Sequence, residues 1–264
     1  MTIRVLILGG TAEARRLAAM LVESPALAIT LSLAGRTANP VPQPVPARSG
    51  GFGGAAGLAA HLVGEAVDLL VDATHPHAAR ISANAVAASV TASVPLLALA
   101  RPPWTRQAGD RWTEVADVAG AVQALGPTPR RVFLALGRQE VGAFVAAPEH
   151  RYLIRSVDRV APRPALPDAA YIVARGPFAE ADDRALLIAH GIEVIVAKNS
   201  GGEATYGKIA AARTLGIEVI LVSRPALPHG PGIARVATVE AAAAWVAGFT
   251  AGRVHASGSA ERGE

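Results

Sequence analysis

Short apolar runs alternate with alanine-rich helical patterns along almost the whole chain. Several runs, such as residues 96–100 and 132–136, are continuously apolar, as is typical of parallel strands covered on both faces. Strands are expected at residues 3–8, 29–34, 69–72, 96–100, 132–136, 170–174, 193–197 and 218–223, and helices at 12–23, 81–92, 179–190, 206–215 and 239–249. This alternation predicts right-handed βαβ units and an α/β fold in which helices flank mainly parallel sheets.

The two halves of the sequence resemble each other. Residues 71–102 and 196–225 each read as a strand, a polar loop, an alanine-rich helix, a second strand and then Arg-Pro. Each segment is followed by a short strand and another helix, and ILGGTAE (7–13) matches LALGRQE (134–140). The similarity favours two equivalent lobes, although separate βαβ units also look alike without a true repeat.

The proline-rich stretch GPTPRR predicts the boundary between the lobes. We expect a first lobe over residues 1–127, a second lobe over 128–251, a cleft between them, and a flexible tail over 252–264. Two similar α/β lobes that face a cleft form a natural ligand site.

Composition excludes several classes of protein. The 264 residues are 51% hydrophobic, include no cysteine and carry a formal charge of +4, which excludes disulfides, a cysteine–zinc site and a disordered chain. No apolar stretch is long enough to span a membrane and no signal peptide is recognisable, so a cytoplasmic protein is expected.

The basic residues carry a separate signal. Of the 25 lysines and arginines, only Lys198 and Lys208 are lysines, and both lie in KNSGGEATYGK. A sequence pI near 10.1 raises the alternative of nucleic-acid binding. Aromatic residues make up only 4% of the chain and the arginines are scattered, so we expect no nucleic-acid partner.

A glycine turn joins the first strand to the first helix. Gly9, Gly10 and Thr11 occupy the position where a dinucleotide phosphate meets the start of a helix, although Gly9 alone matches the three-glycine fingerprint. A purely structural tight turn is the alternative. The position favours a cofactor phosphate site.

Arg36 and Thr37 follow the second strand, where NAD enzymes carry an acidic residue for the ribose 2′-hydroxyl. An arginine here suits a 2′-phosphate, which favours NADPH over NADH. A solvated loop arginine is the alternative.

Two further loops of the first half are candidate cofactor contacts. Four glycines surround Phe52 in RSGGFGG, which favours a ligand loop that includes Gly51 over a flexible connector. The segment DATHPHAARIS follows a core strand and presents Thr74 and His75 at its carboxyl end. Because His75 and His77 lack a third ligand at a suitable spacing, no metal site is expected.

The corresponding loop of the second half is AKNSGGEATYGKI. Ser200, Gly201 and Gly202 form an anion-friendly turn before a helix, and the two lysines flank it. Tyr206-Gly207-Lys208 lacks the Tyr-x-x-x-Lys spacing of short-chain dehydrogenases, which disfavours that family. An ordinary cap and turn is the alternative.

Taken in order, LGGTAEAR, SLAGRT, RSGGFGG, DATHPHA, ARPPW, LALGRQE and KNSGGEATYGKIAAA resemble the precorrin-6A reductase family of cobalamin (vitamin B12) biosynthesis. The resemblance covers residues 3–225, and the combination of DATHP with KNSGG is specific. His77 departs from it, because the family usually has Phe after THP. The resemblance implies two Rossmann-like lobes and an enzyme that reduces a ring double bond of precorrin-6A with NADPH, giving precorrin-6B.

The expected substrate is a flat tetrapyrrole with many carboxylate groups. Lys198 is the candidate for orienting it or supporting negative charge, and Tyr206 or Lys208 for delivering a proton, with solvent as the alternative source. The residues expected to bind the substrate are Arg80, Arg101, Ser200, Gly201, Gly202, Lys208 and Arg224.

Four alternatives stay open at this point. A sister branch of the family acts on the cobalt-containing macrocycle, and the chain could also be a Rossmann-like reductase of an unrelated small substrate. A non-catalytic nucleotide sensor and the nucleic-acid binder considered above are less favoured. No membrane partner is expected, and hand-over of the product to the next pathway enzyme is a possible interaction.

Overall fold

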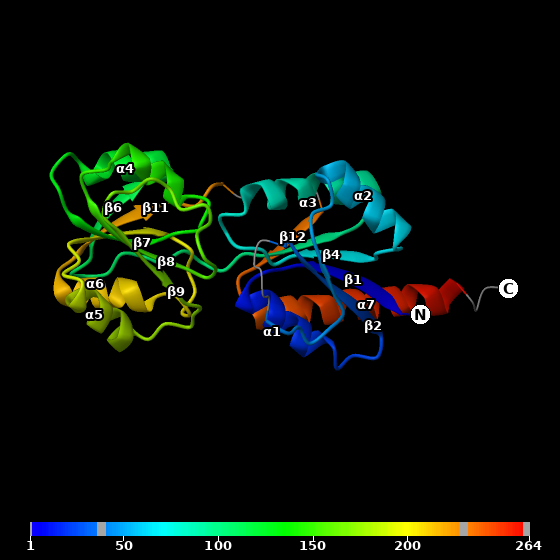
Figure 1. Cartoon of the computed structure of the whole chain (residues 1–264). Coiled ribbons are helices and arrows are strands. Elements are labelled where there is room, and N and C mark those ends of the chain that lie inside the picture. Colours follow the sequence, from blue (N-terminus) through cyan, green and yellow to red (C-terminus); the bar gives the residue numbers. More distant parts are fainter. Residues whose placement is uncertain (1, 36–40, 227–231, 261–264) are drawn as a thin grey trace. The chain divides into compact units, whose positions relative to one another are not determined.

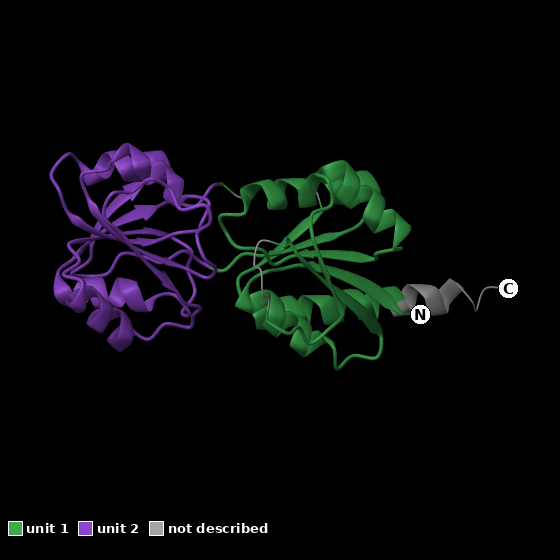
Figure 2. Ribbon diagram, viewed as in Figure 1, with its two compact units in different colours: residues 1–101, 226–264 green, residues 102–225 purple. Residues whose placement is uncertain are grey.

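The computed structural model describes residues 2–35, 41–226 and 232–260, with side chains described as far as Arg253. The chain forms two compact units, residues 1–101 with 226–264 and residues 102–225 (Figures 1 and 2). Each unit contains one six-stranded sheet in which every pairing is parallel. The predicted fold class of two Rossmann-like lobes is confirmed.

The sheet of unit 1 has the order β12-β5-β4-β1-β2-β3. Helices α2 and α3 cover one face and α1 and α7 the other (Figure 1). The strands are β1 (Ile3–Leu8), β2 (Leu27–Leu33), β3 (Ala47–Ser49), β4 (Leu69–Asp72), β5 (Leu96–Leu99) and β12 (Ile233–Val236), and the helices are α1 (Ala12–Leu21), α2 (Ala55–Gly64), α3 (Ala79–Ala92) and α7 (Val239–Ala260).

The sheet of unit 2 repeats this arrangement with the order β6-β11-β10-β7-β8-β9. Helices α5 and α6 pack together on one face, and α4 lies on the other with a short 3₁₀ helix, Val141–Ala146 (Figure 1). The strands are β6 (Arg111–Val115), β7 (Arg131–Ala135), β8 (Arg151–Ser156), β9 (Ala169–Val173), β10 (Val194–Lys198) and β11 (Glu218–Val222), and the helices are α4 (Val118–Leu125), α5 (Glu180–Ala189) and α6 (Gly207–Leu215).

The apolar runs of the central strands form two cores in each unit. Ile7 of β1 packs in the core below α1 and α7, whereas Leu6 and Leu8 pack in the core below α2 and α3. In β7, Leu134 and Phe133 divide in the same way between the two faces of the second sheet. Because both faces are covered, successive residues are all apolar, which explains why these strands are recognisable in the sequence.

The boundary expected at residues 127 and 128 is wrong. That position falls inside unit 2, between α4 and β7, and the chain instead passes between the units after Arg101 and again after Pro225. One edge strand of each sheet therefore comes from the other half of the repeat. Strand β6 pairs with β11 in the sheet of unit 2, and β12 pairs with β5 in the sheet of unit 1. Both passages occur at the repeated Arg-Pro sequence.

Three local expectations also need correction. Helix α7 continues to Ala260, so most of the segment expected as a flexible tail is helical. The glycine-rich segment is a loop only over residues 50–54, because β3 precedes it and α2 begins at Ala55. Strand β8 was not expected. No helix of the described residues is long and apolar enough to cross a membrane.

Candidate active site

The strand order reverses once in each sheet, and this reversal positions the candidate site. In unit 1, β2 and β3 lie on one side of β1, and β4, β5 and β12 lie on the other. Loops that leave the carboxyl ends of β1 and β4 therefore diverge, and open α/β sheets bind ligands in the crevice outside such a point. The equivalent point in unit 2 lies between β7 and β10.

The turn between β1 and α1 favours glycine at two positions. A Cβ atom on Gly9 would lie 3.2 Å from the Cβ of Ala14, and Gly10 has a φ of +103°. The Thr11 hydroxyl caps α1 by accepting a hydrogen bond from Ala14 N at 3.1 Å, and it donates to Ala73 O at 2.7 Å. Thr11 thus ties the start of α1 to the loop after β4, and a helix start in this position attracts phosphate.

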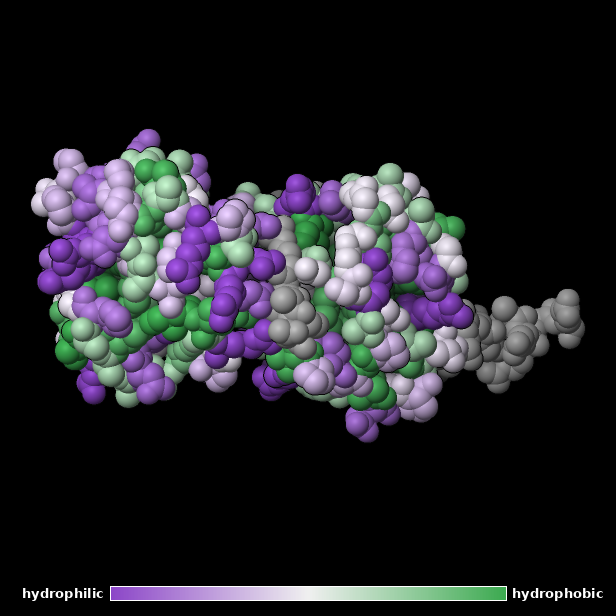
Figure 3. Space-filling model, in the orientation of Figure 1, coloured by the Kyte–Doolittle hydropathy of each residue, from purple (hydrophilic) through white to green (hydrophobic). Residues whose placement is uncertain are grey.

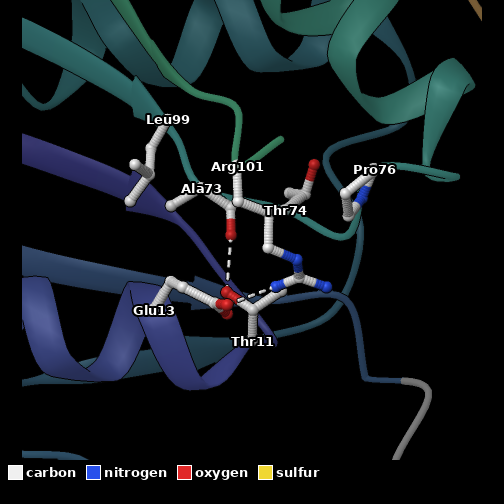
Figure 4. Close-up of a pocket in the computed structure, with 7 residues that line it drawn as sticks. All are labelled: Thr11, Glu13, Ala73, Thr74, Pro76, Leu99 and Arg101. Atoms are coloured by element: carbon white, nitrogen blue, oxygen red, sulfur yellow. Dashed lines mark hydrogen bonds and ion pairs between the residues drawn. The ribbon is translucent and has the colours of Figure 1, made fainter. Parts of the chain in front are cut away.

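A small pocket lies at this reversal point (Figure 4). Its centre is an ion pair of 2.6 Å between Arg101 Nη1 and Glu13 Oε1, whose side chains are 16% and 28% exposed. Arg101, expected to bind substrate, therefore lies beside the expected phosphate site and neutralises an acidic residue there. The pocket is lined by Thr11, Glu13, Ala73, Thr74, Pro76, Leu99 and Arg101.

The loop after β4 is shaped by its own polar side chains. Buried Asp72 accepts hydrogen bonds from the backbone N of Thr74 at 3.1 Å and from its hydroxyl at 2.6 Å. His75 Nδ1 accepts from His77 N at 3.2 Å, so His75 stabilises the turn beside the pocket. Arg80 is exposed in the first turn of α3. The described residues include no group of three side chains that could hold a metal ion.

The glycine-rich loop of unit 1 is organised by an arginine that the sequence analysis did not single out. The Arg48 guanidinium lies 3.9 Å from the centre of the Phe52 ring and donates to Ser32 Oγ at 2.8 Å and Gly50 O at 3.0 Å. It also donates to Gly51 O at 3.4 Å. Because Arg48 fixes it to the end of β2, this loop is an ordered part of the carboxyl edge. The position of Arg48 directly before the glycines, in RSGG, was the sequence feature that could have indicated this role.

Arg36 and Thr37 lie outside the described residues. They follow β2, which ends at Leu33 beside the Arg48 side chain. Their assignment to the cofactor stays a prediction.

Lys198 and Glu140 form an ion pair at the reversal point of unit 2. Lys198 ends β10, whereas Glu140 belongs to the turn after β7 and also accepts a hydrogen bond from Gly137 N at 3.0 Å. Glu140 was not predicted as a site residue. The match of LALGRQE with ILGGTAE was a usable signal, because it aligns Glu140 with Glu13, which also pairs with a cation.

The Ser-Gly-Gly turn after Lys198 needs both glycines. Gly201 and Gly202 have φ angles of +62° and +75°, and a Cβ atom on Gly201 would lie 2.0 Å from Pro102 O. Ser200 is buried, with its hydroxyl 3.4 Å from the Thr205 hydroxyl. The backbone of this turn therefore packs directly against the segment that enters unit 2, and the Ser200 side chain faces inward.

Arg224 also serves this packing. Its Nε donates to Asn199 O at 2.7 Å and its Nη2 donates to Pro102 O at 3.0 Å. The residue expected to bind substrate thus joins the loop after β10 to the first residue of unit 2.

Lys208 does not lie on the surface of the site, contrary to expectation. It is 4% exposed, its ammonium donates to Thr205 O at 2.6 Å, and the Nζ lies 4.9 Å from the centre of the Trp104 ring. Burial, reinforced by the nearby Arg155, lowers the pKa of Lys208 to about 7. The residue lies on the buried face of the first turn of α6, which its place in the motif did not reveal.

Tyr206 is also turned away from Lys198. Its hydroxyl accepts a hydrogen bond from Arg213, about two turns along α6, and Arg213 Nε bonds to Asp110 Oδ1 at 2.8 Å. Asp110 precedes β6, so the Tyr206 hydroxyl points toward the amino ends of the strands. This position does not support the predicted catalytic role.

Comparison with known proteins gives the family of this chain. Residues 4–247 match the model of the precorrin-6x reductase CbiJ/CobK family. The chain belongs to this family. It is 62% identical to a precorrin-6A reductase of a Sinorhizobium species over 221 residues, which cover 84% of this chain and 85% of the relative. It is 52% identical to that of Rhodobacter capsulatus over 246 residues, covering 92% and 96%.

A solved structure of the CbiJ/CobK family has the same fold. The chain matches a structure described as CobK precorrin-6A reductase with a TM-score of 0.88 and 51% identity, covering 94% of this chain and 96% of the other. The family match extends over both units and both passages between them, so the exchange of β6 and β12 lies within the matched region.

Proposed function

We propose that this chain reduces a ring double bond of precorrin-6A with NADPH to give precorrin-6B. Membership of the precorrin-6x reductase family carries the proposal. The similar proteins from Sinorhizobium and Rhodobacter are named for precorrin-6A without cobalt, which favours the metal-free macrocycle over the cobalt-bearing one.

The fit of the β1–α1 turn to a dinucleotide supports the cofactor. Gly9 and Gly10 keep the backbone of the turn free of side chains, Thr11 presents the helix start, and Arg101 neutralises Glu13 in the same pocket. NADPH would supply the hydride at this edge. The residues proposed to hold it are Gly9, Gly10, Thr11, Arg36, Thr37, Gly51, Phe52, Thr74 and His75.

The charge distribution of unit 2 supports a polycarboxylate substrate. Five strands in succession, β7 to β11, each have a cation at or just after their last residue, and the loops after β7 and β8 also carry Glu140 and Asp158. Figure 3 shows a dense band of hydrophilic residues across one end of this unit. A positive edge raises the local concentration of a polyanion. The five cations are Arg138, Arg159, Arg175, Lys198 and Arg224.

The amino edge of the same sheet also carries cations. Arg130 bonds to Glu218 at 2.8 Å and Arg151 to Asp168 at 3.0 Å. These two cations at the amino edge therefore have carboxylate partners, as Lys198 has Glu140 at the carboxyl edge.

Lys198 is the proposed catalytic residue. Its ammonium lies at the reversal point of unit 2, held by Glu140 from the neighbouring strand end. Hydride addition to one ring carbon shifts electron density into the conjugated system, and a fixed cation stabilises the charge that develops there. Since the Tyr206 hydroxyl points away and Lys208 is buried, solvent is the proposed source of the proton.

The proposed function is tested by following NADPH oxidation with precorrin-6A. We expect oxidation only when the tetrapyrrole is present, with a lower rate for the cobalt-bearing form. The Lys198→Ala variant is expected to lower kcat/KM by at least about tenfold, equivalent to ~1.4 kcal/mol. A decrease of less than about threefold contradicts the role of Lys198, and NADPH oxidation with no need for the tetrapyrrole contradicts the substrate.

A further inference from the structure

Trp104 lies near the start of unit 2 and is joined to the loop that follows Lys198. Its backbone N donates to Asn199 Oδ1 at 2.8 Å, and Asn199 Nδ2 donates back to Trp104 O at 3.0 Å. An amide side chain that pairs in this reciprocal way imitates a strand partner and restricts both segments. Asn199 is the residue directly after Lys198, so the contact acts next to the proposed catalytic residue.

The indole ring of Trp104 is hydrogen-bonded to the other end of the same turn. Its Nε1 donates to Gly202 O at 2.9 Å, and the side chain is 9% exposed. Trp104 therefore contacts both Asn199 and Gly202, which enclose the turn at Ser200 and Gly201. Because the ring is packed in the core of unit 2, the hydrogen bond to Gly202 O starts from a fixed point.

Lys208 contacts both Trp104 and this loop from the buried side of α6. Its ammonium lies against the Trp104 ring and donates to Thr205 O, which ends the loop before α6. The pairing of Arg155 with Asp183 lies close to it in the same interior. The buried Lys208 ammonium thus fixes the loop at a third position, Thr205, by a hydrogen bond to the backbone.

We propose that Trp104 is a positioning residue that fixes Lys198 at the carboxyl edge, with Lys208 as its buried support. The inference rests on the proposed function, since it assigns Trp104 a role in the reaction through Lys198. It also gives Lys208 a role that requires no contact with the substrate.

The experiment compares two tryptophans of one core. Trp104 and Trp112 both pack in the same cluster of unit 2, but the Trp112 indole N–H has no hydrogen-bond partner among the described residues. Trp104→Phe and Trp112→Phe therefore remove similar apolar area, and only the first removes a bond to the loop. We expect kcat for the tetrapyrrole to fall about tenfold in Trp104→Phe and less than about twofold in Trp112→Phe. The Kd for NADPH should stay unchanged in both variants.

A double variant separates this inference from the proposed function. If Trp104 acts through Lys198, Trp104→Phe costs little more activity in a Lys198→Ala background. Equal losses of kcat in Trp104→Phe and Trp112→Phe, or full additivity with Lys198→Ala, overturn the inference. Activity retained in Lys198→Ala instead contradicts the proposed function. If Trp104→Phe does not fold, Asn199→Ala removes the reciprocal pair from the loop side and is expected to give the same loss of kcat.

Discussion

Lys208 illustrates at the scale of one residue why a lysine is kept where arginine supplies nearly every other cation. Its ammonium fits between the Trp104 ring and Thr205 O on the buried side of α6. A guanidinium is larger and planar, and it stays charged at every accessible pH. The compact amine can lose its proton when buried, which limits the cost of placing it there.

The buried amine predicts a pH dependence of stability. The pKa of Lys208 falls from 10.5 to about 7 on folding, so the native state binds fewer protons than the unfolded chain between these values. The contribution of Lys208 to the free energy of unfolding therefore increases as the pH rises from 7 to 10.5, by up to ~1.4 kcal/mol per pH unit. Below pH 7 the lysine is charged in both states and the full cost of burial is present.

Urea unfolding of the wild type and the Lys208→Met variant at pH 7.5 and 9.0 measures this contribution. We expect the wild type to gain about 2 kcal/mol more than the variant between the two pH values. The comparison cancels the titration of groups that both proteins share. An equal change in both proteins would show that Lys208 does not titrate on unfolding in this range.

At the scale of strands and loops, the carboxyl edge of unit 2 predicts how the substrate is bound. Arg159 follows β8 and Arg175 follows β9, and both lie on loops at this edge. Replacing both by glutamine should raise the KM for precorrin-6A about fivefold, or about 1 kcal/mol, and the difference should shrink as salt is added.

Arg151 provides the matched control for this prediction. It lies at the amino end of β8, is 71% exposed and pairs with Asp168 at 3.0 Å. Compared with Arg159→Gln alone, Arg151→Gln removes one positive charge from the opposite end of β8. A similar rise in KM for Arg151→Gln would mean that net charge, rather than the carboxyl edge, attracts the substrate.

At the scale of the whole molecule, the exchange of β6 and β12 decides which fragments fold. Residues 102–225 contain all six strands of the second sheet, whereas residues 128–251 lack β6 and include β12, whose partner β5 lies in the other unit. We expect the fragment 102–225 to unfold cooperatively in urea and 128–251 to show no cooperative transition. Far-UV circular dichroism follows both. Cooperative folding of 128–251 alone would contradict the division of the chain described here.

The sequence predicted those features that depend on neighbouring residues. Continuous apolar runs located most of the strands of both sheets, and the turns after β1, β4 and β10 were recognisable because glycines and polar residues interrupt these runs. Strand β8 was missed since Arg155 lies within YLIRS, and the partner of its charge, Asp183, comes from another element. Glu140 had a signal in the internal repeat, whereas Trp104 had no indication of its contact with the loop.

By itself, the sequence determined the α/β class, the family resemblance and the loops that carry the candidate site, because apolar periodicity and turn residues are local properties. Only the tertiary structure decided which sheet receives β6 and β12, since the edge strands of two equivalent parallel sheets offer the same backbone hydrogen bonds to either. It also decided that Lys208 is buried and that the Tyr206 hydroxyl points toward Arg213. The side of a helix that a neighbour covers depends on packing between distant segments, so the sequence of a motif does not specify which of its side chains are buried.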